Sequence, residues 1–207
     1  MSRIDFRLYV VTDRHQTAGR PLLAILDDAT RAGVRAVQLR ERDLTTRELL
    51  TLAENVQRML AGRGTRLFIN DRIDVVRTLS VSGVHLRESS LPPSVARRLL
   101  SPDQFIGVSA HSVAGACAAE AEGADFVVLG PIFETPSKIA YGKPLGLGLL
   151  EEAAAAVRIP IFAIGGISPA RAREVRRAGA FGVAVISSIL SAADVASATR
   201  DLLAAVE

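Results

Sequence analysis

One short segment of the chain carries side chains suited to binding an anion. It reads QLRERD, and strand alternation places Gln38, Arg40 and Arg42 on one face of an extended run. A guanidinium group binds phosphate or carboxylate through two parallel hydrogen bonds. We therefore expect these three side chains to bind an acidic substrate, and an ion pair with Glu41 or Asp43 is the structural alternative.

A histidine and an Asn-Asp pair stand at the ends of other apolar runs. His111 follows Ser109 in GVSAHS, and we interpret it as a general acid/base because imidazole exchanges protons near neutral pH. Ser109 and Asn70 are expected to contact the substrate. Asp71, in LFINDR, either binds Mg2+ or caps the helix that follows it. His85 ends another run and is the weaker histidine candidate.

Two kinds of loop sequence favour a phosphorylated ligand. The stretch IFETPSK offers two hydroxyls and an ammonium group, from Thr135, Ser137 and Lys138, to the oxygens of a substrate. Glycines let the backbone approach an anion, and N–H groups at the start of a helix bind it. On this basis phosphate binding is predicted at a second set of residues, Gly165, Gly166, Ile186 and Ser187.

The elements that must position these residues form a regular alternation. Short apolar runs, rich in β-branched residues, predict eight strands, at 8–12, 36–40, 66–70, 83–86, 105–109, 126–129, 160–164 and 182–186. Segments of helical periodicity lie between them, among them 21–32, 45–61, 112–122 and 169–178. This order predicts an α/β fold, the (β/α)8 TIM barrel, whose active site lies at the carboxyl ends of the strands. A Rossmann-like sheet is the alternative, but no G-x-G-x-x-G follows the first run.

Composition restricts the class of protein. The length of 207 residues predicts one domain over 1–207, and a content of only 4% aromatic residues predicts a core built mostly from Val, Ile, Leu and Ala. A net charge of +3 without a basic run argues against nucleic acid, and no apolar stretch is long enough for a membrane span. We expect a cytoplasmic protein whose single Cys117 is a packing residue, and apolar outer helices are compatible with a homodimer.

Motifs along nearly the whole chain resemble one family. VQLRERDL, LFINDR, GVHLRE, GVSAHS, GADFVVLGPIFETPSK, PIFAIGGISP and GVAVISSI together are similar to thiamine phosphate synthases and their thiazole tautomerase relatives of the TenI type, which share the barrel fold. The resemblance implies a thiazole phosphate held by the glycine and serine loops, with Thr135, Ser137 and Lys138 near the other end of the substrate. In the synthase, Mg2+ and a pyrimidine diphosphate are held by an Asn-Asp pair, a second Asp and a Gln-x-Arg-x-Lys motif.

Two departures from the synthase pattern favour the tautomerase branch. Arg42 replaces the expected Lys, and Ser90 replaces the second metal-binding Asp, which should weaken Mg2+ binding. Our hypothesis is therefore a thiazole tautomerase without a cofactor, which aromatises a carboxylated thiazole phosphate with His111 as acid/base. The alternatives are the synthase, with Mg2+ at Asp71, a non-catalytic barrel that binds thiazole or thiamine phosphate, and a phosphate-binding isomerase of another pathway.

Overall fold

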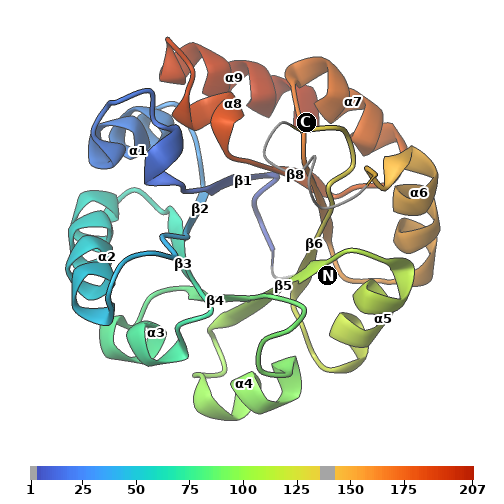
Figure 1. Ribbon diagram of the computed structural model, residues 1–207, viewed down its shortest axis with the longest axis horizontal. Coiled ribbons are helices and arrows are strands. Elements are labelled where there is room, and N and C mark those ends of the chain that lie inside the picture. The colour runs from blue at the N-terminus through green and yellow to red at the C-terminus, as the bar shows by residue number, and fades with distance from the viewer. Residues whose placement is uncertain (1–3, 136–142) are drawn as a thin grey trace.

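Parallel strands close into a barrel that is surrounded by helices (Figure 1). A computed structural model of the chain describes residues 4–135 and 143–207. Its strands are β1 Leu8–Val11, β2 Ala36–Leu39, β3 Arg66–Asn70, β4 Gly83–Leu86, β5 Phe105–Ala110, β6 Phe126–Leu129, β7 Ile161–Ile164 and β8 Gly182–Val185. They pair in chain order, and β1 also pairs with β8, so the sheet has no edge. The predicted (β/α)8 barrel is confirmed.

Helices follow the strands and cover the outside of the barrel. They are η1 Arg14–Gln16, α1 Leu22–Arg31, α2 Thr46–Leu60, α3 Ile73–Leu79, α4 Pro93–Leu99, α5 Val113–Ala121, α6 Gly146–Ala156, α7 Pro169–Arg177, α8 Ser187–Leu190 and α9 Val195–Val206. Every predicted strand, and each of the four predicted helices, agrees with the observed element to within one residue at either end. None of the helices in the described ranges is long and apolar enough to cross a bilayer.

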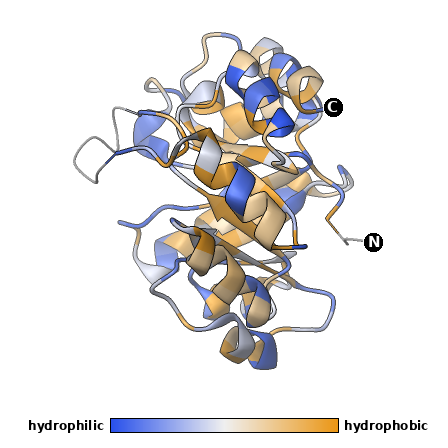
Figure 2. Ribbon diagram, turned by 90° about the vertical axis from the view of Figure 1, so that its right-hand side faces the viewer, coloured by the Kyte–Doolittle hydropathy of each residue, from blue (hydrophilic) through white to orange (hydrophobic). Residues whose placement is uncertain are grey.

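The core has two layers of different composition. Aliphatic side chains pack between the strands and the helices, as expected, and the strands at the centre of Figure 2 are largely hydrophobic. The barrel interior instead has aromatic rings at its centre. Five of the chain's seven Phe and one of its two Tyr lie there: Phe6, Tyr9, Phe68, Phe105, Phe126 and Phe162. The expected core, mostly of Val, Ile, Leu and Ala, is confirmed for the outer layer, and the aromatic inner layer is an addition that the composition did not predict. Because these large rings fill one part of the barrel interior, the part at the carboxyl ends of the strands remains open for a cavity.

Candidate active site

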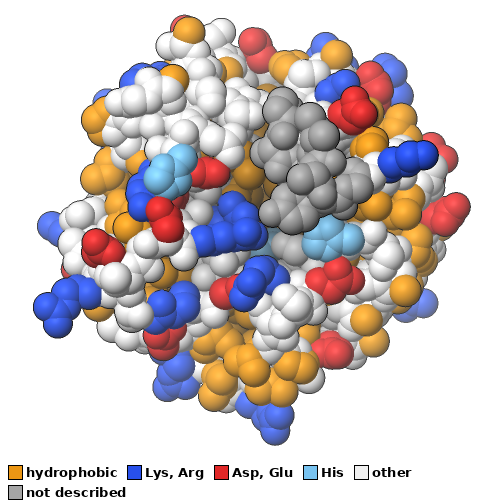
Figure 3. All heavy atoms as spheres, in the orientation of Figure 1, with side chains coloured by type: hydrophobic (Ala, Val, Ile, Leu, Met, Phe, Trp, Pro, Cys, Tyr) orange, Lys and Arg blue, Asp and Glu red, His pale blue; other side chains and the backbone are white. Residues whose placement is uncertain are grey.

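A cavity of about 910 Å³ opens at the carboxyl ends of the strands. Among its lining residues are all the predicted site residues that the structure describes, apart from Asp71: Gln38, Arg40, Arg42, Asn70, Ser109, His111, Thr135, Gly165, Gly166, Ile186 and Ser187. Ser137 and Lys138 lie outside the described residues. Figure 3 shows basic side chains gathered at the centre of this face. The alternation of strands therefore brought most of the predicted set together.

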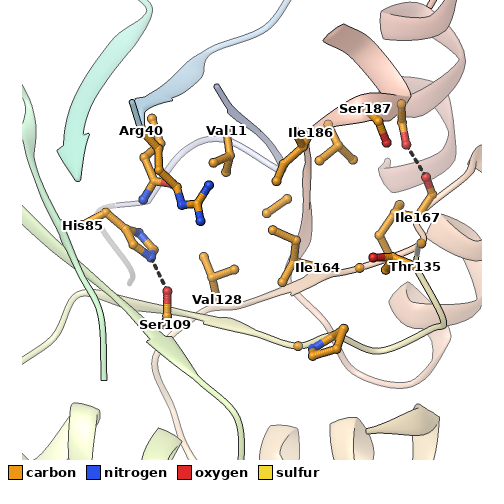
Figure 4. A pocket seen from close by; sticks show the side chains of 18 of the residues that line it. Val11, Arg40, His85, Ser109, Val128, Thr135, Ile164, Ile167, Ile186 and Ser187 are labelled. Carbon is orange, nitrogen blue, oxygen red and sulfur yellow. Dashed lines mark hydrogen bonds between the residues drawn. The ribbon is translucent and has the colours of Figure 1, made fainter. Parts of the chain in front are cut away.

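Three arginines form the basic end of the cavity. Arg40 and Arg42 follow β2, Arg87 follows β4, and Arg40 is half-buried with its side chain directed into the cavity (Figure 4). Burial, and then the neighbouring charge of Arg42, lowers the pKa of Arg40. A guanidinium group remains protonated under such a shift. Concentrated positive charge at one end of a cavity favours a strongly anionic group there.

The alternative interpretation, in which these arginines form ion pairs with Glu41 or Asp43, was wrong. Glu41 and Asp43 bind Arg14, whose Nη1 lies 3.3 Å from Glu41 Oε2 and 2.6 Å from Asp43 Oδ1. Within the described residues, neither Arg40 nor Arg42 forms an ion pair with them. Glu41 is buried and also accepts a hydrogen bond of 2.6 Å from Thr12. The acidic residues of this segment thus anchor the loop, and the guanidinium groups stay available to a ligand.

The floor of the cavity contains His85, which the sequence favoured least among its candidates. Its Nε2 lies 3.0 Å from Ser109 Oγ (Figure 4) and its Nδ1 lies 3.5 Å from the Tyr9 hydroxyl. Burial lowers the pKa of His85 to about 3, so the imidazole is neutral at physiological pH. Its position on β4 was a usable signal, because Val84 and Leu86 on either side face the helices and His85 must then face inward.

Gln38 is the second polar residue at the floor. It is 2% exposed, and its Nε2 has no hydrogen-bond partner among the described residues. Buried amide groups are normally paired, so an orphaned donor that lines a cavity indicates a ligand atom that accepts from it. The predicted substrate-binding role of Gln38 is thus supported by its geometry.

Gly107 makes room for the floor, and its replacement should be costly. A Cβ at Gly107 would lie 2.3 Å from Phe126 Cζ and 2.7 Å from His85 Nδ1. We expect Gly107→Ala to lower the free energy of unfolding by about 1–3 kcal/mol, measured by urea titration, because the packed interior cannot yield. Gly148, exposed on α6 with nothing within 4 Å of such a Cβ, is the control. Gly148→Ala should stabilise by about 0.5–1 kcal/mol, and a similar loss in both variants would contradict this account.

One of the two roles predicted for Asp71, capping the next helix, was wrong. The N-cap of α3 is Arg72, which makes no side-chain cap bond, and Asp71 itself has a φ of 60°. Its carboxylate accepts from Arg87 Nε, from Ser90 Oγ and, at 3.1 Å, from the Arg87 backbone N–H. The carboxylate is therefore tied to the loop after β4, and Ser90 is one of the residues that hold it.

Asp71 is not arranged as a Mg2+ ligand in this structure. No group of three or more His, Cys, Asp or Glu side chains is placed to hold a metal within residues 4–135 and 143–207. The charge of Asp71 is already balanced by Arg87, and Ser90 donates a hydrogen rather than a second carboxylate oxygen. Mg2+ is usually bound by one or two carboxylates together with substrate phosphates and waters, so Asp71 would have to leave Arg87 before it could serve as such a ligand.

His111 lies at the mouth of the cavity rather than in its depth. The residue follows β5, its side chain is 54% exposed, and Nδ1 lies 2.8 Å from Glu88 Oε2. Glu88 lies in the loop after β4 and was not among the predicted site residues. A carboxylate that accepts from one imidazole nitrogen orients the ring and sets its tautomer, an arrangement typical of general acid/base catalysis.

The loop after β7 is built to present N–H groups. Gly165 has a φ of 101° and Gly166 a φ of 65°, and a Cβ at Gly165 would lie 2.7 Å from Pro131 Cβ. The Gly166 carbonyl accepts from Arg171 Nη1 at 2.8 Å, and the Ile167 carbonyl accepts from Ser188 at 2.5 Å. With these carbonyls turned into the protein, the loop and the adjacent start of α8 offer donors to an anion.

Comparisons with a family model, with related sequences and with a solved structure agree on one family. Residues 8–189 match the family model described as thiamine monophosphate synthase. The chain is 49% identical over 204 residues to a putative thiamine-phosphate synthase of Geobacter sulfurreducens, covering 99% of this chain and 96% of that protein. It is 44% identical over 195 residues to a thiamine-phosphate synthase of Moorella thermoacetica, covering 94% and 93%. The solved structure of a thiamine phosphate pyrophosphorylase from Pyrococcus furiosus superposes with a TM-score of 0.87 at 34% identity, covering 97% of this chain and 95% of that one. These names favour the synthase alternative over the tautomerase hypothesis.

Proposed function

The chain belongs to the thiamine monophosphate synthase family, and we propose that it is a synthase that joins hydroxymethylpyrimidine diphosphate to hydroxyethylthiazole phosphate. The observation that carries this proposal is the identity of 44%, over nearly full length, to a protein named thiamine-phosphate synthase, together with 49% identity to one named putative thiamine-phosphate synthase. In this reaction the thiazole nitrogen forms a C–N bond to the pyrimidine methylene carbon. The C–O bond to diphosphate breaks, and its electron pair leaves with the diphosphate.

The two ends of the cavity suit the two substrates. The loop of Gly165 and Gly166 would hold the thiazole phosphate, and the basic end of Arg40, Arg42 and Arg87 would hold the diphosphate. Guanidinium groups stabilise the negative charge that develops on a leaving diphosphate. Within the described residues Arg40 and Arg42 form no ion pair, whereas Arg87 shares its charge with Asp71. The arginines are assigned to this charge neutralisation, and the Mg2+ and EDTA arms of the assay below test whether an ion at Asp71 shares it.

A thiazole tautomerase is the second candidate, and one specific observation favours it. Asp71 is occupied by Arg87 and Ser90, whereas His111 and Glu88 form a hydrogen-bonded pair at the mouth. Proton transfer within a carboxylated thiazole phosphate needs an acid/base and an anion-binding residue, but no metal. The basic end would then hold the carboxylate of the substrate.

A product assay separates these functions. The purified chain is incubated with both synthase substrates, with Mg2+ or with EDTA, and the products are separated by chromatography. We expect thiamine phosphate and diphosphate in equal amounts. No coupling, beside an active synthase control, together with aromatisation of the carboxylated thiazole phosphate would establish the tautomerase instead. Binding of thiazole phosphate without either conversion would indicate a regulatory barrel.

His111→Ala gives a second and independent discrimination. Coupling requires no proton transfer by the protein, so we expect the variant to keep coupling activity within about tenfold of the wild type. A general acid/base contributes about 10²–10⁴-fold to the rate, so a tautomerase would lose that much activity. Glu88→Gln is the matched variant, because it leaves an acceptor beside His111 but removes the charge. Coupling that falls a thousandfold in His111→Ala would count against the synthase mechanism proposed here.

A further inference from the structure

A chain of three polar side chains crosses the floor of the cavity. Tyr9 on β1, His85 on β4 and Ser109 on β5 all project from the inner face of the barrel. The Tyr9 hydroxyl lies 3.5 Å from His85 Nδ1, which is long for a hydrogen bond, and His85 Nε2 lies 3.0 Å from Ser109 Oγ. Figure 4 shows the Ser109 side chain meeting the ring of His85 at the cavity wall.

Only one direction of these hydrogen bonds satisfies every buried donor. If Tyr9 donates to Nδ1, then the proton of the neutral imidazole is on Nε2 and donates to Ser109 Oγ, so the Ser109 hydrogen is directed into the cavity. In the reverse direction the Tyr9 hydrogen has no acceptor among the described residues, although the side chain is fully buried. An unsatisfied buried donor bears its whole desolvation penalty, so the first direction is favoured.

The protonation states agree with this direction. Burial raises the pKa of Tyr9 well above its usual value, so the phenol keeps the hydrogen that it donates. Burial lowers the pKa of His85 to about 3, so the ring has a single N–H. In a neutral ring one nitrogen accepts a hydrogen bond and the other donates one. The direction of the bond at Nδ1 therefore determines the direction of the bond at Nε2.

Gln38 adds a second donor to the same floor. Its buried Nε2 lacks a partner among the described residues and lines the cavity together with Ser109. A ligand must present hydrogen-bond acceptors to these two donors at the floor. A donor on the ligand that faced a donor of the protein would leave both groups unpaired. The aromatic rings below and the aliphatic side chains of Val11 and Val128 in the cavity wall suit a flat ring.

We propose that Tyr9 and His85 are positioning residues that fix the Ser109 hydroxyl as a hydrogen-bond donor, so that the floor selects a heteroaromatic ring with an acceptor nitrogen. The order of the hydrogen bonds rests on the contacts of these three residues alone. The identification of that ring as the pyrimidine rests on the proposed function.

Nitrogen-15 spectra of the wild-type imidazoles test the direction itself. The chain has three histidines, and His15→Asn and His111→Asn variants assign the remaining signals to His85. We expect a protonated Nε2 and an unprotonated Nδ1 that do not titrate between about pH 5 and pH 8. In Tyr9→Phe the proton should be found partly on Nδ1, because Ser109 is then able to donate to Nε2. Thr199→Val, which removes a buried hydroxyl elsewhere, should leave the His85 signals unchanged.

A proton on Nδ1 in the wild type, or an unchanged spectrum in Tyr9→Phe, would overturn the proposal. The wild-type spectrum decides this even if a variant folds poorly.

A double-mutant cycle tests whether Tyr9 acts through Ser109. Calorimetry with hydroxymethylpyrimidine diphosphate should show about five- to tenfold weaker binding for Tyr9→Phe and for Ser109→Ala. Adding Tyr9→Phe to Ser109→Ala should cost little more, because the hydroxyl that Tyr9 orients is already gone. Equal and additive losses would refute the positioning role. If the wild type does not bind this diphosphate, the pyrimidine assignment and the proposed function fail, whereas the spectra still report on the direction of the bonds.

Discussion

Arg40→Gln should lower kcat/KM for coupling by about 10²–10³-fold, the loss seen when one donor to a developing anion is removed. Arg40 is the half-buried member of the basic end, and its guanidinium group points into the cavity (Figure 4). Fixed charge in a water-poor site interacts with an anion more strongly than exposed charge does. The loss should therefore exceed that of Arg42→Gln, whose side chain is exposed.

The same substitution should not destabilise the fold. Burial and the charge of Arg42 both lower the pKa of Arg40, which means that the surroundings disfavour its charge. Within the described residues no carboxylate is paired with it, so removing the charge relieves a cost rather than breaking a contact. We expect an unchanged or higher urea midpoint for Arg40→Gln together with the loss of activity. Such a combination is typical of a residue retained for function.

Matched variants make the measurement specific. Arg47→Gln removes an exposed charge on α2 outside the cavity and should leave kcat/KM within about twofold. Arg40→Lys keeps the charge but loses the planar fork, so it should recover only part of the activity. Steady-state kinetics with both substrates varied would check the set. Full activity in Arg40→Gln would remove the basic end from the mechanism.

The parts of the site that sequence predicted well follow from periodicity. Strand alternation has a period of two, so the apolar neighbours of Gln38 and Arg40 fixed the inward direction of both side chains. The closure of the barrel then brought residues after β2, β5 and β7 to one end. His85 obeyed the same rule, but a lone histidine is more often structural, and its contacts with Tyr9 and Ser109 cross the barrel.

The parts that sequence did not predict depend on contacts between loops. Asp71 was expected to bind a metal or to cap a helix, but its partners come from residues 87 and 90 on the next loop. Likewise, Glu41 pairs with Arg14, which lies 27 residues earlier in the chain, and not with the adjacent Arg40 or Arg42. Side-chain partners across a closed barrel are set by register and loop conformation, and neither is encoded in the local pattern of one segment.

Ser90→Asp should convert the Asp71 region into a Mg2+ site. Ser90 Oγ already donates to Asp71 Oδ1, so a carboxylate at this position would lie beside that of Asp71. Two adjacent carboxylates repel each other, and the hydrogen bond is lost, so we expect the variant to be less stable than the wild type by about 1–3 kcal/mol in EDTA. A divalent ion that binds only the folded state stabilises it by about 2.7 kcal/mol at a hundred times its Kd.

Thermal unfolding with and without Mg2+ therefore distinguishes the two chains. For a chain of this size we expect Mg2+ to raise the Tm of Ser90→Asp by about 5–10 °C and that of the wild type by much less. Arg87 competes with the ion for Asp71, so Arg87→Gly combined with Ser90→Asp should bind Mg2+ more tightly still. Ser89→Asp adds the same charge one position away and should show little of this effect. Equal Mg2+ stabilisation of the wild type and Ser90→Asp would mean that Asp71 already holds the ion despite Arg87, and that Ser90 does not limit Mg2+ binding.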